Sequence, residues 1–142
     1  MRRFESAECV RLRTPAGTAV AAWAARTVSL RLLGLALLPG PGPANALLIP
    51  RCRSIHTLGM RFSLDVAFLA WPPAPESEVL VVRAGVRPRR IVVAGSRDAG
   101  HTAALELRSP SLLAHGIRPG VRLSVDSWSD GVGTGGPGRR SV

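Results

Sequence analysis

Alternating apolar and polar residues predict short β-strands along most of the chain. Residues 9–14, CVRLRT, alternate with the two-residue period of a half-buried strand. Pro-Ala-Gly at 15–17 supplies turn chemistry, and TAVAAW at 18–23 can return as a second strand. We therefore predict a β-hairpin at the start of the folded region.

A central strand is indicated at residues 64–70. There LDVAFLA is apolar at both odd and even positions, which suits a strand that is covered on both faces. A Pro-rich loop is expected at 72–77. Other short segments have strand-like composition, namely 46–50, 53–57, 78–83, 90–94, 102–107 and 121–125.

Two segments have the features of helices. Thr27 can cap a helix that extends to about Leu37, where leucines recur at helical spacing before a Pro-Gly-rich segment ends it. Ser109 followed by Pro110 is a favourable helix start, and Gly116 suits the left-handed position after a short helix.

These segments give many strands, few helices and no regular alternation of strand and helix. The predicted fold is mostly β (β-rich α+β), either a compact jelly-roll-like sandwich or a partly open barrel, with one longer helix and one short helix. The expected organisation is an N-terminal arm at 1–8, a single β-rich domain at 9–126 and a disordered Gly/Ser-rich tail at 127–142.

Composition supports a folded domain and limits the role of charge. The chain has 142 residues, of which 46% are hydrophobic, too many for a disordered chain. The formal net charge is +10, and all 19 basic residues are Arg, which is typical of a GC-rich genome rather than of a selected nucleic-acid surface. Tyr is absent, so aromatic stacking platforms for bases are scarce. We expect only weak, non-specific nucleic-acid binding through the Arg-rich surface.

Charged residues argue against secretion and against a membrane span. Residues 1–13 carry charges where a signal peptide needs an apolar core, and Arg26 and Arg31 interrupt the most apolar stretch. We therefore expect a cytoplasmic protein without a membrane partner, in which Cys9 and Cys52 are reduced thiols.

Three segments resemble those of an uncharacterised prokaryotic family, catalogued as domain of unknown function 192. They are TVSLRLLGL at 27–35, CRSIHTLGMRFSLDVAFLA at 52–70, and ALELRSPSLLAHGIRPGVRLSV at 104–125. The middle segment is similar to the family's central signature, and the resemblance spans residues 9–125. It implies a compact β-rich fold resembling a jelly-roll sandwich. It implies no reaction, because the family has no established activity.

Cys52 and His56 do not have the spacing of a nucleophile and its base. Such a pair needs contact at about 3 Å. In a strand, residues four apart share a face but lie about 13 Å from each other. Cys52 is therefore interpreted as a small buried side chain.

His56 and Asp65 form a more promising pair. A turn at Gly59 would place them on adjacent strands, and Asp65 directly precedes the apolar run. A buried carboxylate must be paired or hydrogen-bonded. It has two interpretations, a polar pocket for a ligand or an internal strut that fixes the turn. The candidate partners are His56, Thr57, Arg53 and Arg61.

Glu106 is the other acidic residue inside a predicted strand. Its neighbours Leu105 and Leu107 point the opposite way, so we expect Glu106 to face solvent. The family resemblance nevertheless adds Glu106 to the candidate ligand-binding residues, because an acidic residue is common at that place. Arg87, Arg89 and Arg90 can hold an anion, although a solvated charged loop is the favoured interpretation.

No metal or cofactor site is predicted. His56, His101 and His115 are scattered, without metal-ligand spacing. The segment GVGTGG at 131–136 matches a dinucleotide-binding pattern only formally, because that motif needs a strand before it and a helix after it, and the sequence ends soon afterwards, at Val142.

The leading hypothesis is a small, monomeric, non-enzymatic binding or accessory module. Its polar pocket around His56 and Asp65 would take a small anionic ligand or a peptide. One alternative is a hydrolase with His56 as general base oriented by Asp65. Another is weak nucleic-acid binding. The candidate ligand-binding residues are His56, Thr57, Asp65, Arg53, Arg61 and Glu106.

Overall fold

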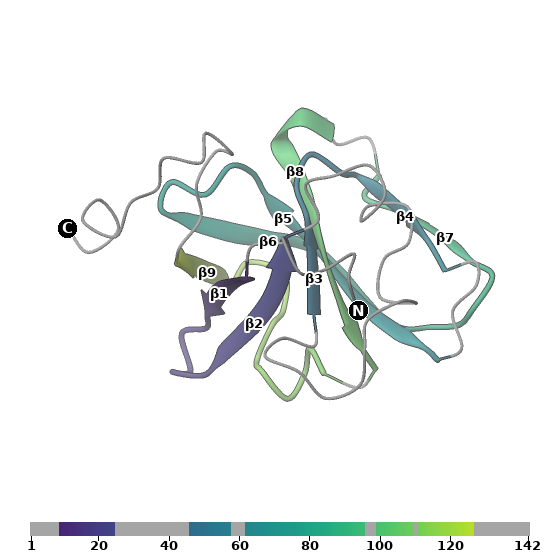
Figure 1. Ribbon diagram of the computed structural model, residues 1–142, viewed down its shortest axis with the longest axis horizontal. Coiled ribbons are helices and arrows are strands. Elements are labelled where there is room, and N and C mark those ends of the chain that lie inside the picture. Colours follow the sequence, from purple (N-terminus) through teal and green to yellow (C-terminus); the bar gives the residue numbers. More distant parts are fainter. Residues whose placement is uncertain (1–8, 25–45, 58–61, 96–98, 110, 127–142) are drawn as a thin grey trace.

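The computed structural model describes residues 9–24, 46–57, 62–95, 99–109 and 111–126 (Figure 1). The predicted N-terminal arm, C-terminal tail and longer helix lie outside the described residues, as does Arg61.

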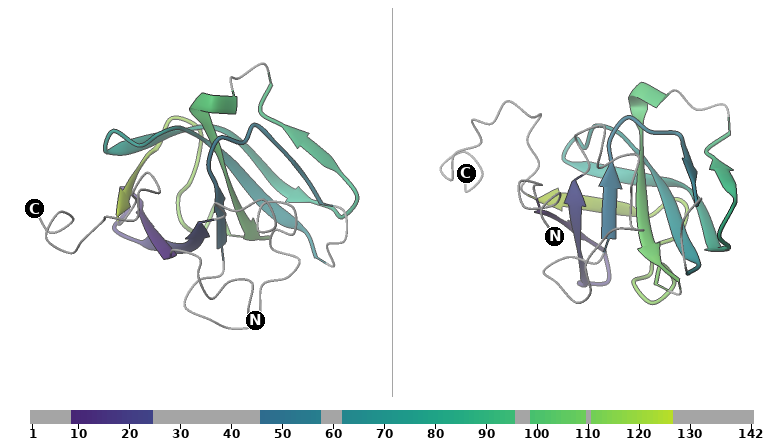
Figure 2. Two further views of the ribbon diagram at one scale, coloured as in Figure 1. Left: turned by 45° about the horizontal axis from the view of Figure 1, so that its top comes forward. Right: turned by 45° about the vertical axis from the view of Figure 1, so that its right-hand side comes forward.

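Seven strands close into a barrel, and two more form a separate two-stranded sheet. The barrel order is β1-β2-β3-β8-β5-β6-β9, and the small sheet consists of β4 and β7. Figures 1 and 2 show the small sheet on one side of the barrel. The strands are β1 (Cys9–Arg13), β2 (Ala19–Ala24), β3 (Ala46–Ile49), β4 (Ser54–His56), β5 (Leu64–Ala70), β6 (Glu76–Val86), β7 (Ile91–Val93), β8 (Thr102–Arg108) and β9 (Arg122–Asp126).

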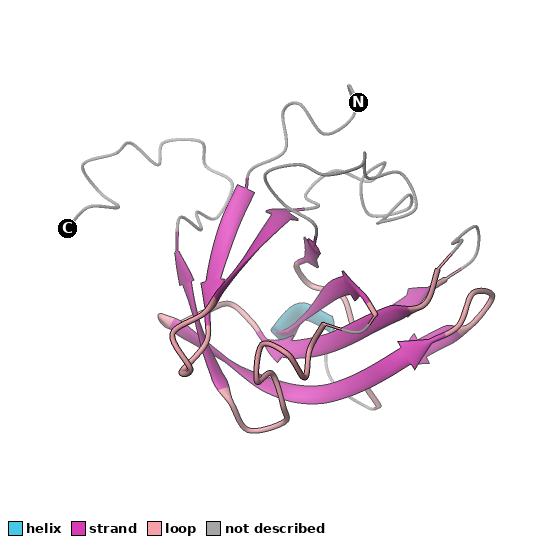
Figure 3. Ribbon diagram, turned by 90° about the horizontal axis from the view of Figure 1, so that it is seen from below, coloured by secondary structure: helices cyan, strands magenta, loops and turns pink. Residues whose placement is uncertain are grey.

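The mostly-β fold class is confirmed, and the sheet is a closed barrel (Figure 3). The predicted hairpin is also confirmed, because β1 and β2 pair antiparallel from Cys9–Trp23 to Arg13–Ala19. β6 starts at Glu76, so the predicted Pro-rich loop is shorter than expected. This extra length lets β6 pair with β9 at one end and with β5 along the rest.

The short helix predicted from Ser109 is not formed in the described residues. Residues 112–116 make successive turns, in which the Gly116 N–H donates to the Leu113 carbonyl and the Ile117 N–H to the Leu112 carbonyl. The local start and stop signals were present, but they produce only a compact turn. A single 3-10 turn, Ala99–His101, is the helical element of the described chain.

Two hydrophobic clusters explain why β5 is apolar on both faces. The first contains residues from all seven barrel strands and fills the interior, as Leu48, Leu105 and Leu123 illustrate. The second joins the opposite face of β3, β5 and β8 to Ile55 of β4 and Val92 of β7. The β4–β7 sheet therefore covers the outer face of the barrel strands, and Phe68 of β5 is fully buried beneath it.

Candidate functional site

His56 and Asp65 lie in different sheets, so the expectation that they occupy adjacent strands is wrong. β4 pairs with β7, whereas both edges of β5 are occupied by β6 and β8. The physical reason is burial. β5 is apolar on both faces and needs a cover, and β4 supplies Ile55 to that cover instead of pairing with β5.

Asp65 binds backbone N–H groups from two distant segments. Its side chain is buried, with 2% exposure. Oδ1 accepts a hydrogen bond from the Gly85 N–H at 2.9 Å, and Oδ2 accepts from the N–H groups of Ser111 at 2.7 Å and Leu112 at 3.0 Å. Asp65 therefore connects the end of β6 to the turn that follows β8, and the strut interpretation describes these contacts.

The hydrogen bonds keep the Asp65 carboxylate ionised despite its burial. Burial by itself raises the pKa of Asp65. The backbone donors of Gly85, Ser111 and Leu112, together with the Ser109 side chain, outweigh that effect and lower the pKa below its ordinary value. A carboxylate that is satisfied in this way needs no cationic partner.

Thr57 fixes the loop between β6 and β7. It is fully buried, and its Oγ1 donates to the Arg87 carbonyl and accepts from the Arg90 N–H, both at 2.7 Å. Its N–H donates to the Arg90 carbonyl at 2.9 Å, and its carbonyl accepts from the Arg89 N–H at 3.1 Å. Arg89 has a left-handed φ of 65°, a conformation that persists where surrounding contacts enforce it. Thr57 provides those contacts.

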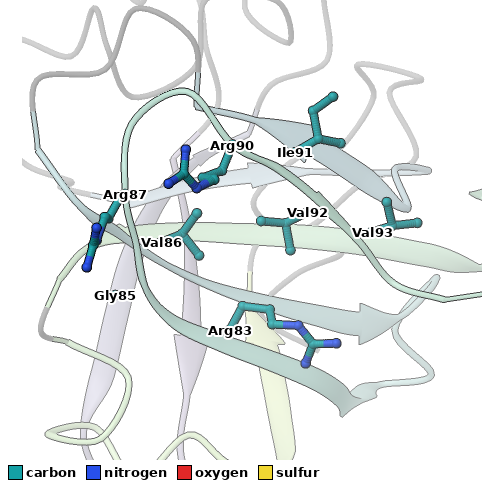
Figure 4. Close-up of a pocket in the computed structure, with 8 residues that line it drawn as sticks. All are labelled: Arg83, Gly85, Val86, Arg87, Arg90, Ile91, Val92 and Val93. Carbon is teal, nitrogen blue, oxygen red and sulfur yellow. The ribbon is translucent and has the colours of Figure 1, made fainter.

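The segment held by Asp65 and Thr57 borders a groove of about 550 Å³. Figure 4 shows Arg87 and Arg90 near the loop at one end and Arg83 on the β6 side. All three arginines are exposed, and none of the lining residues is acidic. The lining residues are Arg83, Gly85, Val86, Arg87, Arg90, Ile91, Val92 and Val93. The groove is therefore a place where positive charge and apolar surface meet.

The remaining predicted residues lie around this groove or beneath the small sheet. His56 is exposed and is the cross-strand partner of Ile91, so it flanks the groove without lining it. Arg53 is exposed just before β4. Cys52 is half-buried, and its thiol donates to the Ser54 carbonyl at 2.9 Å.

Glu106 does not face solvent, which corrects the sequence prediction. It is 4% exposed, and its cross-strand neighbours Leu47 and Val66 belong to the second hydrophobic cluster. Alternation correctly placed Glu106 opposite Leu105 and Leu107. It gave no sign that a second layer covers the outer face of β8.

The groove was only partly foreseeable from the sequence. The sequence indicates that Arg87 and Arg90 can hold an anion, but it does not indicate a role for Arg83 or for the exposed apolar pair Ile91 and Val93. The available signal was the density of arginines in residues 83–90, RAGVRPRR. The density of arginines does not indicate that Thr57 forms hydrogen bonds to the loop before β7.

The described residues contain no group of three His, Cys, Asp or Glu side chains placed to hold a metal ion. In the same part of the chain, no helix is long and apolar enough to cross a membrane.

Comparisons with known proteins identify structural neighbours. No family model matches the sequence, and no curated protein matches it. A protein of unknown function from Novosphingobium aromaticivorans DSM 12444 is similar over 86% of this chain and 85% of its own, with a TM-score of 0.64 and 19% identity. A protein from Sinorhizobium meliloti 1021, described as a candidate transcription regulator, is similar over 84% of this chain and 94% of its own, with a TM-score of 0.62 and 22% identity. At this level of identity, the likeness shows that the chain shares its fold with these two proteins.

Proposed function

We propose that the protein is a small non-enzymatic binding module whose groove at Arg83, Arg87 and Arg90 holds an anionic group. The observation that carries this proposal is that three exposed arginines line one groove, which has no acidic lining residue. Asp65 and Thr57 serve the site by holding its loop. The proposed site therefore lies between β6 and β7, beside the His56 and Asp65 pocket that the sequence predicts.

The chemistry of the groove suits a carboxylate or a phosphate. A guanidinium group presents several N–H donors in a planar fork and can bind either anion through two hydrogen bonds. Val86 and Val92 line the same groove and reduce the water around such contacts, which strengthens them. Because Thr57 fixes the backbone at Arg87 and Arg90, little order has to be gained on binding.

The direct test is titration with inorganic phosphate and with succinate, followed by calorimetry or thermal shift. Replacing Arg87 and Arg90 together by Gln removes two charges but keeps the backbone contacts with Thr57. The matched control replaces Arg118 and Arg122, which are exposed and outside the groove. We expect the groove variant to bind at least about tenfold more weakly, since a hydrogen bond to a charged group contributes about 1.5–3 kcal/mol. Equal loss in both variants, or no binding by the unmodified protein, would contradict the proposal.

The hydrolase alternative is not supported by the positions of His56 and Asp65. It required His56 to be oriented by Asp65, but the Asp65 oxygens accept from Gly85, Ser111 and Leu112. His56 is on a strand of the other sheet.

Weak nucleic-acid binding is the second candidate function. It is supported by the net charge of +10 and by the description of the Sinorhizobium meliloti neighbour as a candidate transcription regulator. Its test is filter binding of DNA across a salt series.

Family membership, location and assembly remain sequence-based proposals. We propose that the chain belongs to the domain of unknown function 192 family, on the strength of residues 52–70. Cytoplasmic location and a monomeric state are likewise expectations. Analytical ultracentrifugation measures the second of these directly.

A further inference from the structure

One edge of β7 lies beside the arginine groove and has no strand partner within the part of the chain that the structure describes. Among the described strands, β7 pairs only with β4. The Thr57 N–H donates to the Arg90 carbonyl and the Ala94 N–H donates to the Arg53 carbonyl, so positions 90 and 94 bond toward β4. Antiparallel pairing alternates, and position 92 therefore also faces β4, whereas the N–H and C=O groups of Ile91 and Val93 point away from it.

The same two residues expose apolar side chains. Ile91 is 74% exposed and Val93 is 43% exposed, and both line the groove. Leu113 is the other large exposed hydrophobic residue of the described chain, and it lies outside the groove. Backbone groups that have no partner among the described residues, apolar side chains and three arginines therefore occur together at one place. Exposed strand edges of this kind are templates for pairing with another segment.

We propose that the groove takes an extended acidic peptide segment of a partner protein, which adds to β7 as a third strand. This inference rests on the proposed anion-binding function and names the partner class. Main-chain hydrogen bonds to Ile91 and Val93 would supply affinity, as in other strand-addition complexes. Side chains alternate along a strand, so apolar residues of the segment meet Ile91 and Val93 while carboxylates reach the arginines.

Charge selects this occupant over a second copy of the chain. Pairing two β7 edges would bring together two surfaces that each carry three arginines and no acidic lining residue, and each copy has a net charge of +10. Like charges held close together destabilise an interface. The edge of β7 has three residues and spans about 10 Å, so a segment of about three to five residues is sufficient to pair with it.

The test compares three labelled peptides of alternating Val and Glu, each about six residues long. One has ordinary amides, and the other two are N-methylated at alternate amides, each on a different edge of the strand. The peptides have the same charge and side chains, but methylation removes main-chain donors. We expect the ordinary peptide to bind in fluorescence anisotropy and one methylated form to bind at least about tenfold more weakly, since several hydrogen bonds are lost.

The protein variants and a small anion separate this inference from the function on which it rests. Replacing Arg87 and Arg90 by Gln should weaken peptide binding, whereas replacing Arg118 and Arg122 should leave it within about twofold, because those arginines lie outside the groove. If all methylated peptides bind as well as the ordinary one while phosphate binds the groove, strand addition is wrong and the anion site stands. If neither peptide nor phosphate binds, both are wrong. If a DNA oligonucleotide binds and the ordinary peptide does not, the peptide proposal is overturned.

Discussion

Asp65 shows how a single buried carboxylate organises segments that are distant in the sequence. Among the described residues, its oxygens accept from the main chain of Gly85, Ser111 and Leu112. Each of these donors belongs to a turn or a strand end, where backbone groups lack regular partners. The Asp65 carboxylate therefore supplies the hydrogen-bond acceptors for backbone N–H groups at the end of β6 and in the turn after β8.

Asp65→Ala should lower the free energy of unfolding by about 2–4 kcal/mol, because three backbone N–H groups lose their acceptor. Chemical denaturation measures the change. His56→Ala is the comparison and should cost less, since His56 is exposed. Unfolding of Asp65→Ala at the same midpoint as the unmodified protein would show that these contacts contribute nothing.

The same contacts predict an acid-sensitive component of stability. Folding lowers the pKa of Asp65 from its ordinary value of 3.8, so the folded state binds protons less readily than the unfolded state. The stabilisation is complete above pH 3.8 and is lost as the pH falls through the lowered folded-state pKa. The stability difference between the unmodified protein and Asp65→Asn, measured across this range, should therefore shrink on acidification. A difference that is constant with pH contradicts an ionised Asp65 strut.

The segment from β6 to β7 is likewise held in place by side chains that are distant in the sequence. Gly85 is held by Asp65, and the loop from Arg87 to Arg90 is held by Thr57. Asp65 lies in β5 and Thr57 directly follows β4, and neither residue lines the groove. The conformation of the arginine-bearing segment from β6 to β7 is therefore fixed by side chains from other parts of the chain.

Thr57→Val should loosen this loop while keeping the size of the buried side chain. The change removes the hydroxyl that bonds to Arg87 and Arg90, and we expect a loss of about 1–3 kcal/mol in unfolding free energy. Affinity for phosphate should fall as well, because the groove arginines are then less well positioned. Thr57→Ser retains the hydroxyl and should restore both. If Thr57→Val unfolds at the same denaturant midpoint and binds phosphate as well as the unmodified protein, the hydroxyl contacts to Arg87 and Arg90 do not hold this loop.

Strand positions were predictable from sequence, but their partners were not. The pattern in LDVAFLA located β5 at its observed bounds and indicated cover on both faces. β4 and β7 were each expected as strands, yet nothing local predicts that Ile55 will pair with Val92. The turn signal at Gly59 favoured pairing of neighbours in the chain. Competition for the edges of β5, which β6 and β8 occupy, decided otherwise.

The candidate site was less predictable than the fold for the same reason. Burial of Asp65 follows from its place before an apolar run, and the structure gives 2% exposure. Its donors, however, are 20, 46 and 47 residues away along the chain. Such contacts depend on the closed barrel, so sequence patterning identified the acceptor without its partners.

For the whole molecule, the dominant property is a net charge of +10. Charge of this size attracts polyanions through counterion release, whether or not a specific site exists. The groove gathers three of the arginines, while others such as Arg118 and Arg122 are exposed elsewhere. Substitutions inside and outside the groove therefore distinguish binding at the groove from the general attraction of polyanions to the positive charge.

Retention of DNA in filter binding should be independent of base sequence and should vanish by physiological salt. The groove variant at Arg87 and Arg90 and the control variant at Arg118 and Arg122 should lose similar amounts of DNA affinity, because each removes two charges. A much larger loss in the groove variant, or retention at physiological salt, would instead indicate a dedicated nucleic-acid site.

The closure of the barrel also has a consequence for the order of events during synthesis. β9 is the last strand of the described chain to leave the ribosome, and it pairs with β1 on one side and β6 on the other. The Arg13–Asp126 ion pair across this seam joins residues 113 positions apart. Until Arg122–Asp126 emerges, β1 and β6 both lack a neighbour, and the nascent chain has two open edges that are prone to mispairing. Closure of the barrel therefore has to wait until β9 has left the ribosome.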